Sequence, residues 1–351
     1  MGRFLPFEEG TDRFAPVARR HHPLTIGFQG SFGPWRGGLE GQSPSRLRPM
    51  NTLIADIGGT NARFALHDGT TYTPPVKLAL DGFTNIAAAI AAYLGDRPPP
   101  ASAVLAVAGP VQNNQVRLTN RGWVVDGAEI AAALGIGRVR VVNDFEALSW
   151  ALPHLGGADL LQLGGSVGEK GAPMAVLGAG TGLGVGAFLP PDRVLASEGG
   201  HASLAAHDAR EAAVIETLRA KYGHVSAERL LSGMGIENIH AALGGDPALE
   251  DTEITVRAIA GTDARCREAL SMFCAILGGV AGDLALLYGA RGGVFIGGGI
   301  CPRFPDFLAA SEFRTRFEAK GRFRDWLAPI PAWLILRQDP AMLGLATLAW
   351  R

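Results

Sequence analysis

Short apolar runs and longer amphipathic stretches alternate along the chain from residue 50 onward. Strands are predicted at residues 53–66 (as a hairpin), 103–107, 138–142, 175–177, 184–189 and 293–296. The helical period of apolar positions predicts helices at residues 83–94, 129–134, 209–222 and 264–288. Because strands and helices alternate, the pattern indicates an α/β architecture.

A hairpin closed by a glycine-containing turn occurs twice, at residues 53–66 and 175–189. This recurrence suggests two related domains with a cleft between them. Residues 1–49 differ from the rest, because they are rich in Arg, Gly and Pro and show no sustained period. We interpret them as a disordered extension or as a start assigned too far upstream, with a targeting or regulatory role as the alternative.

Composition excludes several classes of protein. The chain has 351 residues, 47% of them hydrophobic and 19% charged, which indicates a folded protein large enough for two domains. The net charge of -1 gives no basic field for nucleic acid. The uncharged run within residues 172–191 is interrupted by glycines and is interpreted as strand, loop and strand; residues 272–288 contain Asp283 and are interpreted as a core helix.

The cysteines do not form a disulfide or zinc pattern. Cys266, Cys274 and Cys301 are an odd and sparse set without a CxxC pair. We expect buried thiols in a reducing cytosol. No membrane partner is expected either.

The first candidate site follows the first strand. Asp56 precedes Gly58 and Gly59, and Thr60 and Asn61 come next. The glycines let a phosphate approach the backbone N–H groups, and the carboxylate can hold Mg²⁺ directly or through water. The alternative is an ordinary hairpin turn with a side-chain cap.

The second candidate site is the glycine loop at residues 178–184, which carries one hydroxyl, on Thr181. The series Gly182, Gly184 and Ala187 fits a loose dinucleotide-binding fingerprint. That interpretation is rejected, because a strand-like stretch follows where the fingerprint requires a helix. A Walker A sequence is also lacking.

Asn143 and Asp144 end a buried strand. A carboxylate placed there suits a general base that removes a proton from an attacking sugar hydroxyl. The alternative is that Asp144 caps the following helix, and the two roles are compatible. Farther on, Glu198 and His201 flank two glycines that can aim both side chains into one pocket. Such a pair suits a polyol, with a metal site or a plain surface turn as alternatives.

Seven ordered segments together resemble bacterial glucokinases: LIADIGGTNARFAL, VVNDFEALSWALP, VLGAGTGLGVGAF, EGGHASLA, HVSAERLLSGMGIENIH, GGVFIGGGICPRF and FEAKGRF. The resemblance covers residues 50–351 and implies the two-domain fold of the hexokinase, actin and heat-shock ATPase superfamily. It implies a small domain at 50–154 on which 338–351 packs back, and a large domain at 155–337. It also implies a cytoplasmic enzyme, often a homodimer, that uses ATP with Mg²⁺ to phosphorylate the glucose 6-hydroxyl.

The resemblance also implies roles for individual residues. The phosphate motifs correspond to Asp56, Gly58, Gly59, Thr60 and Asn61, and to Gly180, Thr181 and Gly182; the adenosine-side loop corresponds to Gly297, Gly298 and Gly299. The sugar ligands correspond to Asn143, Asp144 (also the base), Glu198, His201 and Glu228. A TNxxW segment that lines the sugar site corresponds to Thr119, Asn120 and Trp123.

The chain departs from the family after His201, where Ala-Ser-Leu replaces acidic and aromatic residues and affects the expected sugar preference. One rival interpretation is a ROK-type kinase of another hexose or of an N-acetylated hexosamine. Those proteins carry a zinc-binding cysteine cluster soon after the corresponding histidine, whereas the next cysteine here is Cys266. The other rival is a catalytically silent nucleotide-binding regulator on the same fold.

Overall fold

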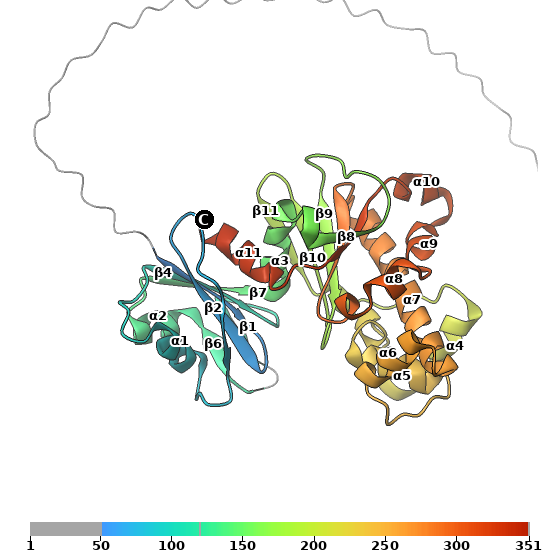
Figure 1. Cartoon of the computed structure of the whole chain (residues 1–351), viewed down its shortest axis with the longest axis horizontal. Helices are drawn as coiled ribbons and strands as arrows, with labels where there is room; N and C mark the ends of the chain where they lie inside the picture. The colour runs from blue at the N-terminus through green and yellow to red at the C-terminus, as the bar shows by residue number, and fades with distance from the viewer. Residues whose placement is uncertain (1–50, 119–120, 350–351) are drawn as a thin grey trace, which may run out of the picture. The chain divides into compact units, whose positions relative to one another are not determined.

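Two mixed β-sheets form the framework of the protein (Figure 1). The computed structural model describes residues 51–118 and 121–349, so the predicted extension and the predicted sugar-site residues Thr119 and Asn120 lie outside the described residues. The first sheet has the order β3 (Val76–Ala79), β2 (Asn61–His67), β1 (Thr52–Ile57), β4 (Ser102–Val107) and β7 (Arg138–Asn143). The second has the order β11 (Arg193–Ser197), β10 (Leu183–Leu189), β9 (Met174–Ala179), β12 (Gly293–Gly297), β13 (Ala332–Ile335) and β8 (Leu160–Gly164).

Both predicted hairpins are present and have the same surroundings. β1 pairs antiparallel with β2 and parallel with β4. In the second sheet, β9 pairs antiparallel with β10 and parallel with β12. A separate two-stranded ribbon joins β5 (Gln115–Arg117) and β6 (Val124–Asp126). The hairpin that occurs twice in the sequence therefore has the same pattern of strand pairing in both sheets.

Both faces of the first sheet are covered. Residues 53, 55 and 57 of β1 pack in a core with α1 (Ile86–Leu94) and α2 (Gly127–Leu134). Ile54 on the opposite face packs in a core with residues of α3 (Asp144–Ala151) and α11 (Pro340–Leu348). The α11 helix packs along α3 and also contacts β1 and β4. The boundaries predicted for the two domains stay a prediction.

The second sheet carries the largest core. The helices on this part of the chain are α4 (Ala209–Tyr222), α5 (Gly233–Ala242), α6 (Asp251–Ala260), α7 (Ala264–Tyr288), α8 (Pro305–Ala309), α9 (Phe313–Glu318) and α10 (Arg324–Leu327). Within the described part of the chain, α7 is the one helix long and apolar enough to cross a membrane by length and composition. Most of its apolar stretch is buried against the second sheet and its neighbours, so the predicted core helix is confirmed.

The helix α3 lies against β10 because glycines leave room for it (Figure 1). A Cβ atom on Gly184 would collide with the Phe145 ring, and one on Gly186 would collide with the Ser149 hydroxyl. On the other side of α3, a Cβ on Gly344 of α11 would collide with the Ala147 carbonyl. Close packing on both sides therefore fixes the position of α3, whose first residue is Asp144.

The three cysteines are buried and free, as predicted. Burial raises the pKa of the Cys274 thiol to about 12 and raises that of Cys301 further. Both thiols therefore stay protonated at neutral pH. They act as small apolar side chains in the core rather than as nucleophiles.

Candidate active site

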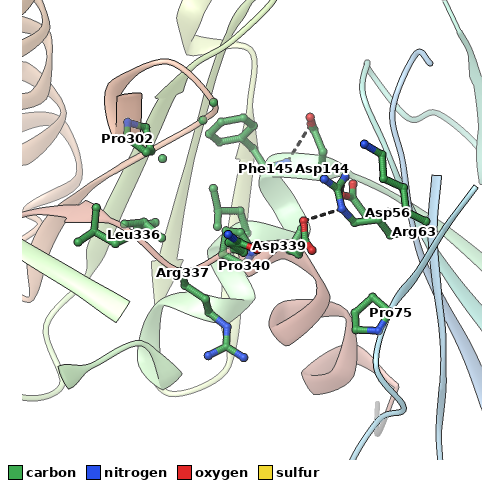
Figure 2. Close-up of a pocket in the computed structure, with 18 residues that line it drawn as sticks. Asp56, Arg63, Pro75, Asp144, Phe145, Pro302, Leu336, Arg337, Asp339 and Pro340 are labelled. Carbon is green, nitrogen blue, oxygen red and sulfur yellow. Dashed lines mark hydrogen bonds and ion pairs between the residues drawn. The ribbon is translucent and has the colours of Figure 1, made fainter. Parts of the chain in front are cut away.

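A cavity of about 580 Å³ brings together residues that lie far apart in the sequence (Figure 2). Asp56 reaches it from β1, Asp144 from the start of α3, and Gly297, Gly298 and Gly299 from the end of β12. Two predicted phosphate- or nucleotide-binding elements therefore open into the same cavity as the predicted base. The volume suits a small-molecule ligand.

Asn143, and not Asp144, caps the helix α3. The Asn143 Oδ1 atom accepts hydrogen bonds from the backbone N–H groups of Phe145 (2.8 Å) and Glu146 (3.2 Å). Its amide nitrogen donates to the Gly109 carbonyl at 3.1 Å. The interpretation of Asp144 as the N-cap is therefore wrong, since one residue earlier satisfies the helix end. This leaves the Asp144 carboxylate one local bond, from the Phe145 N–H at 3.0 Å.

The pKa of Asp144 is raised to about 6. Burial is the main cause, since it disfavours the charged form, and the negative charge of Asp56 adds to it. Glu198 contributes a smaller push in the same direction, and hydrogen bonding to the backbone opposes both. Asp144 is therefore a stronger base than an ordinary aspartate and remains mostly ionised at neutral pH.

Asp56 occupies the same cavity next to a cation. The Arg63 Nη1 atom lies 3.5 Å from Asp56 Oδ2, and Arg63 Nε lies 2.5 Å from Asp339 Oδ1 (Figure 2). Burial raises the pKa of Asp56 and Arg63 works against that rise. Three carboxylates, those of Asp56, Asp144 and Asp339, line this cavity. Such a set fits Mg²⁺, which is usually held by one or two carboxylates together with waters and substrate phosphates. The described residues contain no cluster of three or more His, Cys, Asp or Glu able to hold a metal by themselves.

The predicted sugar-binding acids and histidine form one cluster. His201 ends the short 3₁₀ helix Gly199–His201, and its Nε2 lies 4.0 Å from Glu198 Oε2. The His201 Nδ1 atom lies 3.8 Å from Glu228 Oε1. The other Glu228 oxygen accepts a hydrogen bond from the Leu183 N–H at 3.0 Å. These groups offer both donors and acceptors to a polyol.

The backbone of the segment after His201, where the chain departs from the resembled family, helps to hold this cluster together. The Ala202 carbonyl accepts a hydrogen bond from the Ala227 N–H at 2.9 Å, and Ser203 forms a bridge with Ser226. These contacts hold the segment before Glu228 beside the segment that carries His201. Ala202 and Ser203 also line a second cavity that does not contain His201.

The glycines of the phosphate motifs allow close backbone packing. A Cβ on Gly182 would approach Glu228 Oε2, so this glycine leaves room for the carboxylate. Gly298 has a φ of +83°, and a Cβ there would collide with the Ala179 carbonyl at the end of β9. The second glycine loop and the Gly297–Gly299 loop are therefore in direct contact, which a larger residue at 298 would prevent.

Two of the four remaining predicted residues of the first phosphate motif lie at a different cavity. Gly59 and Thr60 line it together with Arg121 and Trp123, and the Arg121 Nε donates to the Gly59 carbonyl at 2.5 Å. Gly58 and Asn61 close the turn through the bond from Gly58 N–H to Asn61 O at 2.9 Å. Gly180 N–H donates to Gly182 O at 2.8 Å around Thr181. The predicted roles of all these residues stay predictions.

The structure adds three cations that the sequence interpretation missed. Arg63, Lys77 and Arg337 line the main cavity. None is part of a glycine motif, and each becomes visible only once strand register and the path before α11 are known. The alternation of side chains along residues 61–67 was the one signal available for Arg63.

Comparison with known proteins identifies the family. A family model described as Glucokinase matches residues 53–351. A glucokinase from Paramagnetospirillum magneticum is 46% identical over 310 residues, which cover 84% of this chain and 96% of that protein. The chain belongs to the glucokinase family. The predicted family is thereby confirmed, and the match of the glucokinase model favours it over the ROK-type alternative.

Solved structures confirm the fold class of this glucokinase-family chain. A crystal structure of glucokinase from an Antarctic psychrotroph matches with a TM-score of 0.78 at 36% identity, over 86% of this chain and 98% of that one. A ROK family glucokinase from Streptomyces griseus, solved with glucose and AMPPNP, matches with a TM-score of 0.57 at 20% identity, over 85% of this chain and 98% of that one. The second likeness concerns the fold alone. Both agree with the predicted hexokinase and actin type of α/β fold.

Proposed function

We propose that this glucokinase-family chain transfers the γ-phosphate of ATP to the 6-hydroxyl of D-glucose, giving glucose 6-phosphate and ADP. The observation that carries the proposal is the Asp144 carboxylate, whose pKa of about 6 suits a base, in a cavity shared with Asp56 and the Gly297–Gly299 loop. Family membership supplies the substrate class.

Asp144 acts as the general base. The sugar 6-hydroxyl is a weak nucleophile until its proton is removed as it attacks the phosphorus. The raised pKa strengthens the carboxylate as a proton acceptor, while leaving most of it ionised at pH 7. The cap bonds of Asn143 and the packing of α3 hold Asp144 in place, so little reorganisation is needed at the moment of reaction.

Sugar binding is assigned to Asn143, Asp144, Glu198, His201 and Glu228, with Asn120 as a further expected ligand. Glu228 is already oriented by the Leu183 N–H, and His201 lies between the two glutamates. A hexose that replaces the water among these groups would satisfy several donors and acceptors at once. The selectivity for glucose then depends on matching its hydroxyl pattern, since unmatched buried groups are costly.

Nucleotide binding is assigned to the three glycine loops. Asp56 is the residue that would hold Mg²⁺, through water that the ion retains from its hydration shell. Bound there, the ion would supply neutralisation of phosphate charge. The backbone N–H groups of Gly59 and Thr60 and of Thr181 and Gly182 are proposed to bind phosphate oxygens. Gly58 and Gly180 are proposed to shape the two turns, since their N–H groups already donate to Asn61 O and Gly182 O. Gly297, Gly298 and Gly299, which line the main cavity, are assigned to the adenosine side.

The direct test is product identification. Purified protein is incubated with ATP, Mg²⁺ and glucose, ADP release is followed, and the sugar phosphate is assigned by NMR. We expect glucose 6-phosphate, with fructose and N-acetylmannosamine giving a far lower kcat/KM. A higher kcat/KM for N-acetylmannosamine would favour the ROK-type activity, and no turnover of any sugar would favour the silent regulator.

We further infer a homodimer that works in the cytoplasm. Family membership supports the first inference, and the three free, buried cysteines agree with a reducing compartment. Light scattering coupled to size-exclusion chromatography tests the oligomeric state. A mass of one chain across the micromolar range would contradict the dimer.

A further inference from the structure

Three charged residues form a row across neighbouring strands of the first sheet. Asp56 on β1 is directly opposite Arg63 on β2, and Arg63 is directly opposite Lys77 on β3. Residues directly opposite one another in a sheet point to the same face. All three line the main cavity, and Figure 2 shows Arg63 beside Asp56 and Asp339.

The two cations of this row differ in how they are held. Arg63 is about one-third exposed and pairs with both Asp56 and Asp339. Lys77 is exposed, and its side chain makes no ion pair or hydrogen bond with any residue in the described part of the chain. Arg337, the third cation of the cavity, is already engaged by Asp159 at 3.1 Å and by the Tyr72 hydroxyl at 3.4 Å. Lys77 is therefore the cation available to a ligand.

Lys77 lies directly opposite Arg63, whose charge is already matched by Asp56 and Asp339. An anion bound at this point would therefore pair with Lys77 without breaking an existing ion pair. Phosphoryl transfer also needs positive charge around the transferred group, and this chain has no Walker A lysine to provide it.

We propose that Lys77 binds the polyphosphate of the nucleotide in this cavity, while Arg63 holds Asp56 in position beside it. The proposal rests on the proposed function for the identity of the anion as a nucleotide. Lys77 then contributes a charge-assisted hydrogen bond to a phosphate oxygen, and Arg63 acts as a positioning residue.

Kinetics of Lys77→Gln test the contact. Loss of one charge-assisted hydrogen bond should raise KM for ATP or lower kcat so that kcat/KM for ATP falls about tenfold or more. KM for glucose should stay within about twofold. Lys170→Gln is the matched control, because Lys170 is an exposed loop lysine and the change in net charge is the same. Lys77→Arg should recover part of the loss. A Lys77→Gln enzyme that matches the Lys170→Gln control would overturn the proposal.

Chemical protection provides a readout that does not depend on turnover. The chain has four lysines, Lys77, Lys170, Lys221 and Lys320, so acetylation of each can be followed by mass spectrometry. Saturating AMPPNP with Mg²⁺ should slow acetylation of Lys77 at least severalfold and leave Lys170 unchanged. Equal labelling of Lys77 with and without nucleotide would contradict the contact. Protection of Lys77 in a protein that fails to phosphorylate any sugar would uphold this inference and remove the proposed activity.

Discussion

The buried carboxylate of Asp144 lowers the free energy of unfolding when it is ionised. Its folded pKa of about 6 lies above the ordinary value, so the native state prefers the protonated carboxyl. The ionised form is therefore less stable in the folded protein than in the unfolded chain. This destabilisation is absent below the ordinary aspartate pKa and is complete once the pH exceeds about 6. A carboxylate that destabilises the fold when ionised is expected to have a functional role and not a structural one.

The same shift predicts the acid limb of the pH profile. The base must be ionised to accept a proton, so kcat/KM for glucose should fall as the pH drops through about 6. An ordinary aspartate would place that limb near pH 4. Initial rates between pH 5 and 8, with saturating ATP and the stability of the enzyme checked at each pH, measure the limb. A flat profile down to pH 5 would contradict the assignment of this pKa to the base.

At the scale of elements, the position of α3 depends on glycines in the sheet beneath it. Gly184→Ala would place a methyl group 2.0 Å from two carbons of the Phe145 ring, and Phe145 is the residue next to Asp144. We expect a loss of about 1–3 kcal/mol in unfolding free energy, as for overpacked cores, together with a lower kcat because the N-terminus of α3 must shift. Denaturant unfolding and steady-state kinetics measure both effects.

Gly82→Ala is the matched control, because a Cβ at Gly82 meets nothing within 4 Å. It should change neither stability nor kcat by more than a small margin. If Gly184→Ala behaves like this control, the close packing of α3 on β10 does not position the base.

Elements with clear end signals were predictable from the sequence. The helices α4 and α7 begin and end as predicted, because Asp208 and Asp263 cap their first turns and glycines follow their last. The helix α1 begins at Ile86 rather than at residue 83, because the Asn85 side chain caps it. The short strands β3, β5, β6, β8, β11 and β13 were missed. Runs of three to five residues carry too little alternation to be recognised.

The site was predictable where its chemistry lies in contiguous motifs. The candidate acids and glycines at or just beyond the ends of β1, β7, β9 and β12 could be recognised directly, since each follows an apolar run. The row of Asp56, Arg63 and Lys77 could not be, because it depends on the register of three strands. The cap at Asn143 was assigned one residue too late, because both residues are good caps and only the observed hydrogen bonds distinguish them.

At the scale of the whole molecule, the proposed sugar ligands come from both predicted domains. Asn143 and Asp144 belong to the predicted small domain, and Glu198, His201 and Glu228 to the predicted large one. Glucose that contacts both sets should favour a closed form of the enzyme. Small-angle scattering with saturating glucose should therefore give a smaller radius of gyration than without it. An unchanged profile would mean that the cleft is already closed or that this division of ligands is wrong.

The central claim, that Asp144 is the general base of a glucokinase, is tested most directly by Asp144→Asn. The change keeps the shape of the side chain and removes its charge and basicity. General-base catalysis is worth roughly 10²–10⁴-fold, so kcat should fall at least ~10²-fold while glucose binding, measured by calorimetry, weakens far less. The melting temperature at pH 8 should equal or exceed that of the wild type, because a destabilising buried charge is removed. A folded Asp144→Asn enzyme with kcat within a few fold of the wild type would contradict the account.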